Sequence, residues 1–155
     1  MAENQMRHVL DGYKVLDFTQ IVAGPTCTLM LAEMGADVIK VELAPAGDPT
    51  RGAEVNINGR SGYFVQHNRG KRGICVDVKK PDGLAIIKDL VATVDVLVEN
   101  YAPGVIGRLG LDYQTVKSIN PKIVMASISA FGQTGPLANE PGFDYLGAAY
   151  GRKPQ

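Results

Sequence analysis

Residue types that form covalent cross-links and metal sites are scarce in this sequence. The 155 residues include two cysteines, two histidines and no tryptophan. Cys27 and Cys75 stand far apart, without Cys-x-x-Cys or another metal-ligand spacing, and with His8 and His67 they make a poor zinc set. We therefore expect no metal site, and two reduced thiols that are buried as small hydrophobic side chains.

An excess of charge of either sign is also missing. Sixteen Lys and Arg balance sixteen Asp and Glu, so no whole-chain field would attract nucleic acid or an anionic membrane. Apolar runs are far shorter than the ~20 residues that span a bilayer, and the polar residues 1–8 do not resemble a signal sequence. We expect a cytoplasmic chain with one core, with neither nucleic acid nor membrane as a partner.

The clearest pattern in the sequence lies in residues 15–42. They predict a strand over residues 15–18, a loop, a helix with Pro25 at its first position, a Gly35 cap and a β-branched strand over residues 38–42. A strand, a helix and a second strand in this order indicate a parallel βαβ unit.

The alternation of strands and helices continues to residue 129. The expected elements are an irregular loop over residues 44–62, a helical turn over 63–66, strands over 74–78, 94–98 and 123–129, a helix over 81–91, a short helix ending at 109, and a helix capped by Asp112 that stops before Asn120. The pattern predicts an α/β fold: an open, mostly parallel, Rossmann-like sheet with helices on both faces.

Ligands of such sheets bind beyond the carboxyl ends of the strands, so the strand-exit loops are the candidate site. A dinucleotide is one alternative, because Glu42 ends the second strand of the βαβ unit. The Gly-x-Gly-x-x-Gly turn is missing, however, since only Gly24 is present and Pro25 after it lacks an amide donor. Glu42 is then expected to be a strand-end carboxylate that faces water.

One dense cationic segment contains Arg69, Lys71 and Arg72, and Arg108 follows a later strand. A solvated loop explains such a segment when it is considered alone. As a ligand site it favours the phosphates of a small molecule over nucleic acid, which requires a broader positive face. Tyr101 is a candidate for stacking on an adenine, or a partly buried aromatic side chain.

A series of short motifs, taken together, closely resembles the family III (CaiB/BaiF) coenzyme A transferases, and the resemblance covers nearly the whole chain. The motifs are Leu10-Asp11-Gly12, Val15-Leu16-Asp17-Phe18-Thr19, Ala23-Gly24-Pro25, Met34-Gly35-Ala36-Asp37-Val38-Ile39-Lys40-Val41-Glu42, Gly47-Asp48 with Thr50-Arg51, Asn68-Arg69-Gly70-Lys71-Arg72, Asp95-Val96-Leu97-Val98-Glu99-Asn100-Tyr101, Pro103-Gly104, Gly132-Gln133-Thr134-Gly135-Pro136 and Pro141-Gly142-Phe143-Asp144-Tyr145.

The resemblance implies transfer of CoA from an acyl-CoA thioester to a carboxylic acid, with CoA as substrate and no permanently bound cofactor. In the family an aspartate attacks the thioester to give an aspartyl anhydride, and the released CoA thiolate then forms an enzyme thioester. By analogy the CoA-binding residues are Val22, Ala23, Val76, Asp77, Val78, Lys79, Asn100, Tyr101, Ala102 and Arg108, with phosphate contacts from Arg69, Lys71 and Arg72.

The resemblance also implies what this chain lacks. The family's nucleophilic aspartate and second domain lie in later segments, so residues 1–155 correspond to the N-terminal part of the large domain of a two-domain, interlocked fold. The chain then holds no catalytic nucleophile, and Asp144 is at most an auxiliary group. A histidine precedes the matching aspartate in the racemase branch, whereas this chain has Phe143, which cannot exchange a proton.

Two hypotheses remain. In the first, the chain is a truncated, inactive form of a CoA-transferase. In the second, it is a non-catalytic CoA-binding or assembly module. In either case we expect a homodimer or pairing with a family member, and a chain that self-associates through uncovered edges.

Overall fold

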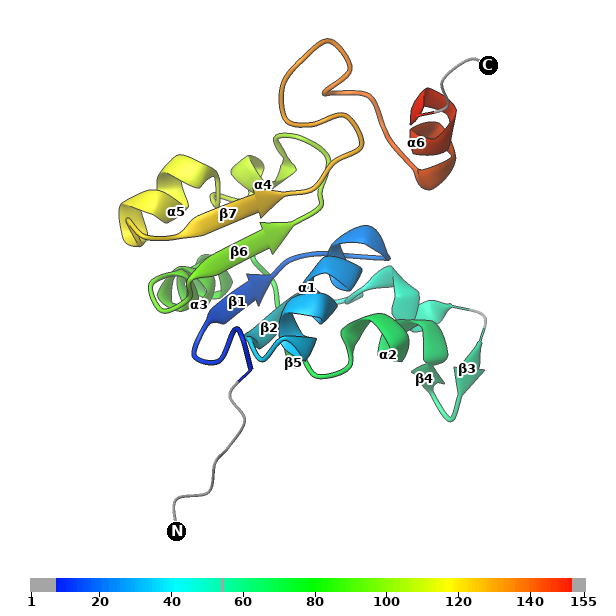
Figure 1. The fold of residues 1–155 in the computed structure, drawn as a ribbon. Helices are drawn as coiled ribbons and strands as arrows, with labels where there is room; N and C mark the ends of the chain where they lie inside the picture. The colour runs from blue at the N-terminus through cyan, green and yellow to red at the C-terminus, as the bar shows by residue number, and fades with distance from the viewer. Residues whose placement is uncertain (1–7, 54, 152–155) are drawn as a thin grey trace.

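A computed structural model describes residues 8–53 and 55–151, without the side chain of Asp144. Its centre is a five-stranded sheet in the order β5-β2-β1-β6-β7, and each neighbouring pair is parallel (Figure 1). The strands are β1 (Lys14–Asp17), β2 (Asp37–Leu43), β5 (Arg72–Val76), β6 (Val96–Glu99) and β7 (Val124–Ser127). The predicted open parallel sheet is confirmed. β2 and β5 extend it on one side of β1, and β6 and β7 extend it on the other, so the strand order reverses at β1.

Helices cover both faces of this sheet (Figure 1). One face carries α3 (Pro81–Val91), α4 (Val105–Arg108) and α5 (Tyr113–Ile119), while α1 (Ala23–Glu33) and α2 (Gly62–Asn68) lie on the other. Between β2 and α2 lie a 3-10 helix, η1 (Pro49–Gly52), and a hairpin of β3 (Asn56–Ile57) and β4 (Arg60–Ser61). A long segment then leads from β7 to α6 (Asp144–Gly151), which stands apart from the layers.

Alternating side chains on each strand build two cores. Leu16, Phe18 and Leu97 are fully buried in the larger core with α3, α4 and α5. Val15 and Val98 point to the α1 face and are each about 1% exposed. This two-sided burial is what a parallel sheet inside an α/β layer structure requires.

The ends of several helices follow the predicted signals. Gly35 has a φ of 101° just after α1, Pro81 opens α3, and the carboxylate of Asp112 accepts a hydrogen bond from the amide of Thr115 at 3.0 Å. The predicted start of α1 is wrong by two residues, because the helix begins at Ala23 and Pro25 is its third residue. Pro25 is still tolerated there, since amides of the first turn have no intrahelical acceptor.

The prediction of a wholly irregular loop over residues 44–62 is wrong. Asn58 and Gly59 have φ values of 53° and 76°, which are those of a two-residue type I′ hairpin turn between β3 and β4. The Asn-Gly dipeptide signals this turn, but β3 and β4 are only two residues long and lack an alternating apolar pattern.

The edge strands leave several side chains uncovered. Cys75 on β5 is exposed and Cys27 is half-buried, so the prediction of two buried thiols is wrong, although both are free cysteines. On the other edge, Val124 of β7 is 60% exposed.

Among the described residues, no helix is both long and apolar enough to cross a bilayer.

Candidate functional site

The central feature of the site is a link between the loops that leave β1 and β6, at the point where the strand order reverses. The side chain of Asn100 accepts a hydrogen bond from the amide of Gln20 at 2.8 Å and donates one to the carbonyl of Gln20 at 2.9 Å. Both backbone groups of one loop residue are therefore held by one side chain of the other loop. Crevices at such switch points are where open α/β sheets bind ligands.

The next residues of the β1 loop are strained and exposed. Ile21 has a φ of 69°, which is unusual for a β-branched side chain, and is 47% exposed. Val22 is the N-cap residue of α1 without a capping side chain, and it is 38% exposed. Strain of this kind persists only where the surroundings enforce it, and the Gln20–Asn100 pair supplies that constraint.

Gly24 explains how the two loops approach so closely. A Cβ atom at this position would lie 2.4 Å from Cβ of Thr19 and 3.1 Å from Cγ of Asn100. The amides of Ala23 and Gly24 belong to the first turn of α1 and have no intrahelical acceptor. These two donors at the switch point suit a developing negative charge on a bound group.

A buried ionic network holds the last residue of β1, Asp17, and so positions the loop that follows it. Four acceptors surround the ammonium of Lys71, which shares its three N–H donors among them: the carboxylate of Asp17 at 3.0 Å, the hydroxyl of Thr28 at 2.8 Å, the side-chain oxygen of Asn68 at 2.9 Å and the carbonyl of Pro25 at 3.0 Å. The side chains of Lys71 and Asp17 are 1% and 0% exposed. Burial lowers the pKa of Lys71, and the nearby Asp17 carboxylate opposes that shift.

A second buried lysine holds the same loop from β2. The ammonium of Lys40 donates to the carbonyl of Thr19 at 2.8 Å and pairs with the carboxylate of Asp48 at 2.9 Å. Thr19 in turn donates its amide, at 2.8 Å, and its hydroxyl, at 2.5 Å, to Asp17. The two lysines thus fix Thr19 and Asp17, the residues that precede the Gln20–Asn100 link.

Glu42 is not the water-facing carboxylate that the sequence predicted. It is 7% exposed and forms two hydrogen bonds of 2.6 Å with the guanidinium of Arg51. Burial raises the pKa of Glu42, but hydrogen bonds from Arg51 and the amide of Asp48 outweigh this effect and leave the pKa lowered. The residue missed by the sequence-based prediction is Arg51, which turns a strand-end acid into a structural ion pair.

The β6 loop holds the other predicted CoA contacts. The amide of Tyr101 donates to the carboxylate of the buried Glu99 at 2.8 Å, and Ala102 beside it is exposed. The Tyr101 hydroxyl is buried and has no hydrogen-bond partner among the described residues. Burial raises the pKa of Tyr101, and the charge of Glu99 acts in the same direction.

Arg108 ends α4 with an exposed side chain that has no ion-pair partner in the described part of the chain. Gly104, the left-handed N-cap of α4 with a φ of 80°, leaves room for it: a Cβ there would lie 3.3 Å from the Arg108 side chain. Arg108 therefore stays available to an anion in solution.

The predicted CoA contacts after β5 differ from one another in exposure. Val76 and Val78 are buried, at 8% and 4% exposed, whereas Lys79 is exposed. Asp77 accepts a hydrogen bond from the amide of Lys79 at 3.1 Å and so shapes the turn into α3. Of these residues Lys79 is exposed and Asp77 is half-buried, whereas the Val76 carbonyl already accepts a hydrogen bond from the amide of Ala44 at 3.1 Å.

The structure does not gather the predicted phosphate contacts around one point. Arg69 pairs with Glu33 on α1, and Arg72 donates to Asp37 at 2.8 and 2.5 Å, while the Lys71 ammonium points inward. Each cation has its own carboxylate, so the segment ties β5 and α2 to the rest of the fold.

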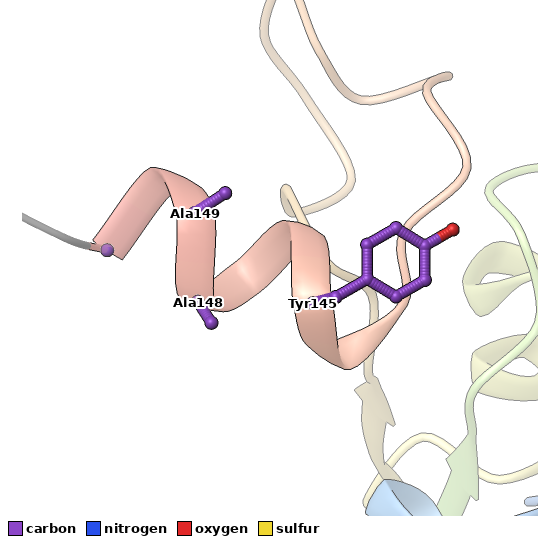
Figure 2. Close-up of a pocket in the computed structure, with 4 residues that line it drawn as sticks. Tyr145, Ala148 and Ala149 are labelled. Atoms are coloured by element: carbon purple, nitrogen blue, oxygen red, sulfur yellow. The ribbon is translucent and has the colours of Figure 1, made fainter.

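The last motif lies against the exit of β7. A Cβ at Gly142 would be 1.9 Å from Cβ of Ala130, so only glycine allows this approach. Asp144 begins α6, but its side chain lies outside the described residues. A hollow of about 630 Å³ beside α6 is lined by Tyr145, Ala148, Ala149 and Gly151, the first three labelled in Figure 2. All four come from one helix, so the hollow lacks converging groups from other elements.

Candidate metal ligands do not cluster: no three His, Cys, Asp or Glu side chains of residues 8–53 and 55–151 could hold an ion together. The structure is an open α/β fold whose strand order reverses at β1, the place where such sheets bind ligands. Comparison with protein families identifies it further. Residues 10–152 match the model of CoA-transferase family III, and the chain belongs to that family.

Several curated proteins are similar to this chain. Succinyl-CoA:glutarate CoA-transferase of Homo sapiens is 44% identical over 141 residues, which are 90% of this chain and 32% of that protein. Formyl-CoA:oxalate CoA-transferase of Rhodopseudomonas palustris is 49% identical over 128 residues, covering 82% and 30%. The chain thus spans about a third of the length of these relatives.

Solved structures show the same fold. A CaiB/BaiF family protein from Brucella suis superposes with a TM-score of 0.85 at 41% identity, over 90% of this chain and 38% of that one. The hypothetical protein Rv3272 from Mycobacterium tuberculosis gives a TM-score of 0.85 at 37% identity, over 96% and 42%. The resemblance that the sequence motifs indicated is confirmed.

Proposed function

We propose that this chain supplies the CoA-binding wall of a family III CoA-transferase, which moves CoA from an acyl-CoA thioester to a carboxylic acid. The observation that carries the proposal is the double hydrogen bond between Asn100 and Gln20. This pair fixes two strand-exit loops at the switch point of the sheet, where open α/β sheets bind ligands. The chain belongs to a family of CoA-transferases, so CoA is the ligand that we place there.

Each open group has a role in this proposal. Val22 and Ala23 line the thioester, and the amides of Ala23 and Gly24 face the oxygen on which charge develops. Asn100, Tyr101 and Ala102 border the CoA chain together with the backbone of residues 76–79. Arg108 meets the CoA phosphates as an unpaired guanidinium.

The chemistry requires a carboxylate nucleophile. Its oxygen attacks the thioester carbonyl carbon, the C–S bond breaks, and the CoA thiolate leaves an aspartyl anhydride behind. The thiolate then attacks the aspartyl carbonyl of the anhydride, which forms an enzyme thioester and releases the donor acid as a carboxylate. The acceptor carboxylate attacks this thioester and expels the CoA thiolate, and the thiolate attacks the acceptor's acyl carbon in the new anhydride, which gives the acceptor-CoA thioester and frees the aspartate. We propose that residues 1–155 are the N-terminal part of the large domain and hold no such nucleophile, with Asp144 at most auxiliary.

A non-catalytic module that binds CoA or pairs with a family member is the second candidate. The open side chains at the switch point favour it, because they provide a binding surface without a placed nucleophile. Either role has an acyl-CoA and a carboxylic acid as small-molecule partners, and a homodimer or a family member as the protein partner. The proposed compartment is the cytoplasm.

Calorimetry with free CoA tests the binding part. The chain should bind CoA with micromolar affinity, and Arg108→Gln should weaken binding about tenfold because a charged hydrogen-bond donor is lost. Arg72→Gln is the matched control, since Arg72 pairs with Asp37 away from the switch point. Absence of CoA binding, or equal weakening by both variants, would refute the proposal.

Mass spectrometry of thioesters tests the catalytic part. The 155-residue chain alone should not move CoA from an acyl-CoA to an added acid. Any turnover by the chain would overturn this part of the proposal, and its loss in Asp144→Ala would show that the turnover requires Asp144.

A further inference from the structure

A second cavity lies in the segment that follows β2, away from the loops that leave β1 and β6. Its volume is about 260 Å³, and it is lined by Arg51, Gly59, Arg60, Ser61, Phe64 and Val65. These residues come from η1, the β3–β4 hairpin and α2, whereas the proposed CoA wall comes from the exits of β1 and β6. The cavity combines two guanidinium groups with an aromatic and a branched apolar side chain.

Arg51 is held rigidly at this cavity. Glu42, itself 7% exposed, accepts hydrogen bonds from Nε and from one terminal nitrogen of Arg51, both at 2.6 Å. The guanidinium carbon also lies 3.8 Å from the centroid of the Phe64 ring. A guanidinium has five N–H groups, so the edge opposite Glu42 keeps donors for a further acceptor.

Arg60 is presented by the hairpin turn. Ile57 pairs with Arg60 across the strands, and Asn58 and Gly59 form the tight turn between them. Within residues 8–53 and 55–151, no carboxylate lies within ion-pair distance of Arg60. Because Glu42 neutralises Arg51, the described residues give the cavity about one uncompensated positive charge.

We propose that this pocket binds a small monocarboxylate with an apolar body. One carboxylate group matches the single excess charge and accepts from Arg60 and from the open edge of Arg51. The apolar body of the acid packs on Phe64 and Val65, which a compact inorganic anion would leave unused. The volume lies below the ~300 to 1,000 Å³ of pockets for drug-sized ligands, which suits a short-chain acid.

This pocket does not depend on the proposed CoA site, so the two fail separately. Calorimetry uses butyrate as the probe, with acetate and inorganic phosphate as comparators. Butyrate should bind in the millimolar range and about tenfold tighter than acetate, because two more methylene groups leave water. CoA affinity, measured on the same sample, should be unchanged by the presence of butyrate.

Arg60→Gln should weaken butyrate binding about tenfold, because the loss of a charged donor removes one of the two anchors. Arg60→Lys should give an intermediate affinity, and Arg69→Gln, a surface arginine paired with Glu33, should leave it unchanged. Circular dichroism establishes that each variant is folded. No saturable butyrate binding, equal affinity for acetate, tighter binding of phosphate, or an unaltered Arg60→Gln variant would each overturn the proposal.

Discussion

Asn100 satisfies both backbone hydrogen-bonding groups of Gln20, 80 residues earlier in the chain, with distances of 2.8 and 2.9 Å. The contact joins the two loops that diverge at the switch point of the sheet. It also restrains the residue before Ile21, whose backbone is strained. The proposed CoA wall depends on this pair.

Asn100→Ala should therefore affect both stability and ligand binding. Losing the side chain leaves two part-buried backbone groups unpaired, so we expect the free energy of unfolding to fall by about 1 to 3 kcal/mol. Urea denaturation measures this loss, and calorimetry should show weaker binding of CoA.

Asn120→Ala is the matched control for that variant. Asn120 also donates to two backbone carbonyls, Val91 at 3.1 Å and Val94 at 2.7 Å, but at the opposite end of the sheet. It should lose stability without losing CoA affinity. Equal loss of affinity in the two variants would mean that general destabilisation, and not the loop link, governs binding.

Ile21→Gly should make the protein more stable. A β-branched residue at a φ of 69° carries strain of about 1 to 3 kcal/mol, whereas glycine adds only about 0.5 to 1 kcal/mol of unfolded-state entropy. The side chain is 47% exposed, so the loss of its buried half offsets part of the gain. Thermal and urea denaturation should show the gain, and an unfolding midpoint that falls would contradict the strain at Ile21.

Lys71→Met should destabilise far more than Arg72→Met, although the two residues are adjacent. Removing Lys71 leaves the carboxylate of Asp17 buried and unpaired, which costs about 3 to 5 kcal/mol. Arg72 and Asp37 are 64% and 43% exposed, so solvent screening limits that pair to about 0 to 1 kcal/mol. Similar unfolding midpoints for the two variants in urea would contradict the buried network.

Acid should destabilise the fold through Asp48 and Glu42. Burial raises both pKa values, but hydrogen bonds outweigh it: from Thr50 and Lys40 at Asp48, and from Arg51 and the Asp48 amide at Glu42. Both folded-state pKa values are therefore lower than the ordinary 3.8 and 4.5. As the pH falls, the unfolded chain takes up protons on these two carboxylates before the folded chain does. The stabilisation from Asp48 and Glu42 is therefore complete above their ordinary pKa values, and it is lost as the pH falls through their lower folded-state pKa values.

Urea midpoints between pH 7 and pH 3 would test this dependence, with the fall expected below about pH 4.5. Asp48→Asn should show a flatter fall than the natural chain, because one titrating group is gone. A midpoint that rises on acidification, or a slope unchanged by Asp48→Asn, would contradict the assignment.

Exposed apolar side chains should make the chain self-associate. Met30 on α1 and Met34, the C-cap residue of α1, are 58% and 43% exposed, and Val124 on the edge strand β7 is 60% exposed. Sedimentation velocity over a wide concentration range should show larger species as concentration rises, and Val124→Lys should reduce them. A single monomeric species at every concentration would count against this expectation.

The sequence predicted most of the fold because strands and helices here follow strong local patterns. Three local signals in the sequence predicted helix positions that the structure confirms. They are the amphipathic spacing of α3, Gly35 after α1 and Asp112 at the N-cap of α5. The β3–β4 hairpin was missed because two-residue strands carry no periodic signal, although Asn58-Gly59 marked its turn.

The candidate site was less predictable, since side-chain partners are set by tertiary contacts. The cluster of Arg69, Lys71 and Arg72 reads as one positive segment, yet the fold directs each cation to a different carboxylate. Glu42 likewise meets Arg51, which lies nine residues later, only after the chain turns through Asp48. Asn100, by contrast, was predicted at the site, but its hydrogen bonds to Gln20 are visible only in three dimensions.

The most direct test of the CoA wall is a titration of the isotopically labelled chain with CoA, followed by the amide NMR signals. The account predicts saturable shifts of Gln20, Ile21, Ala23 and Tyr101, while amides of α5 stay in place. Shifts confined to other parts of the chain, or none at an excess of CoA, would contradict it.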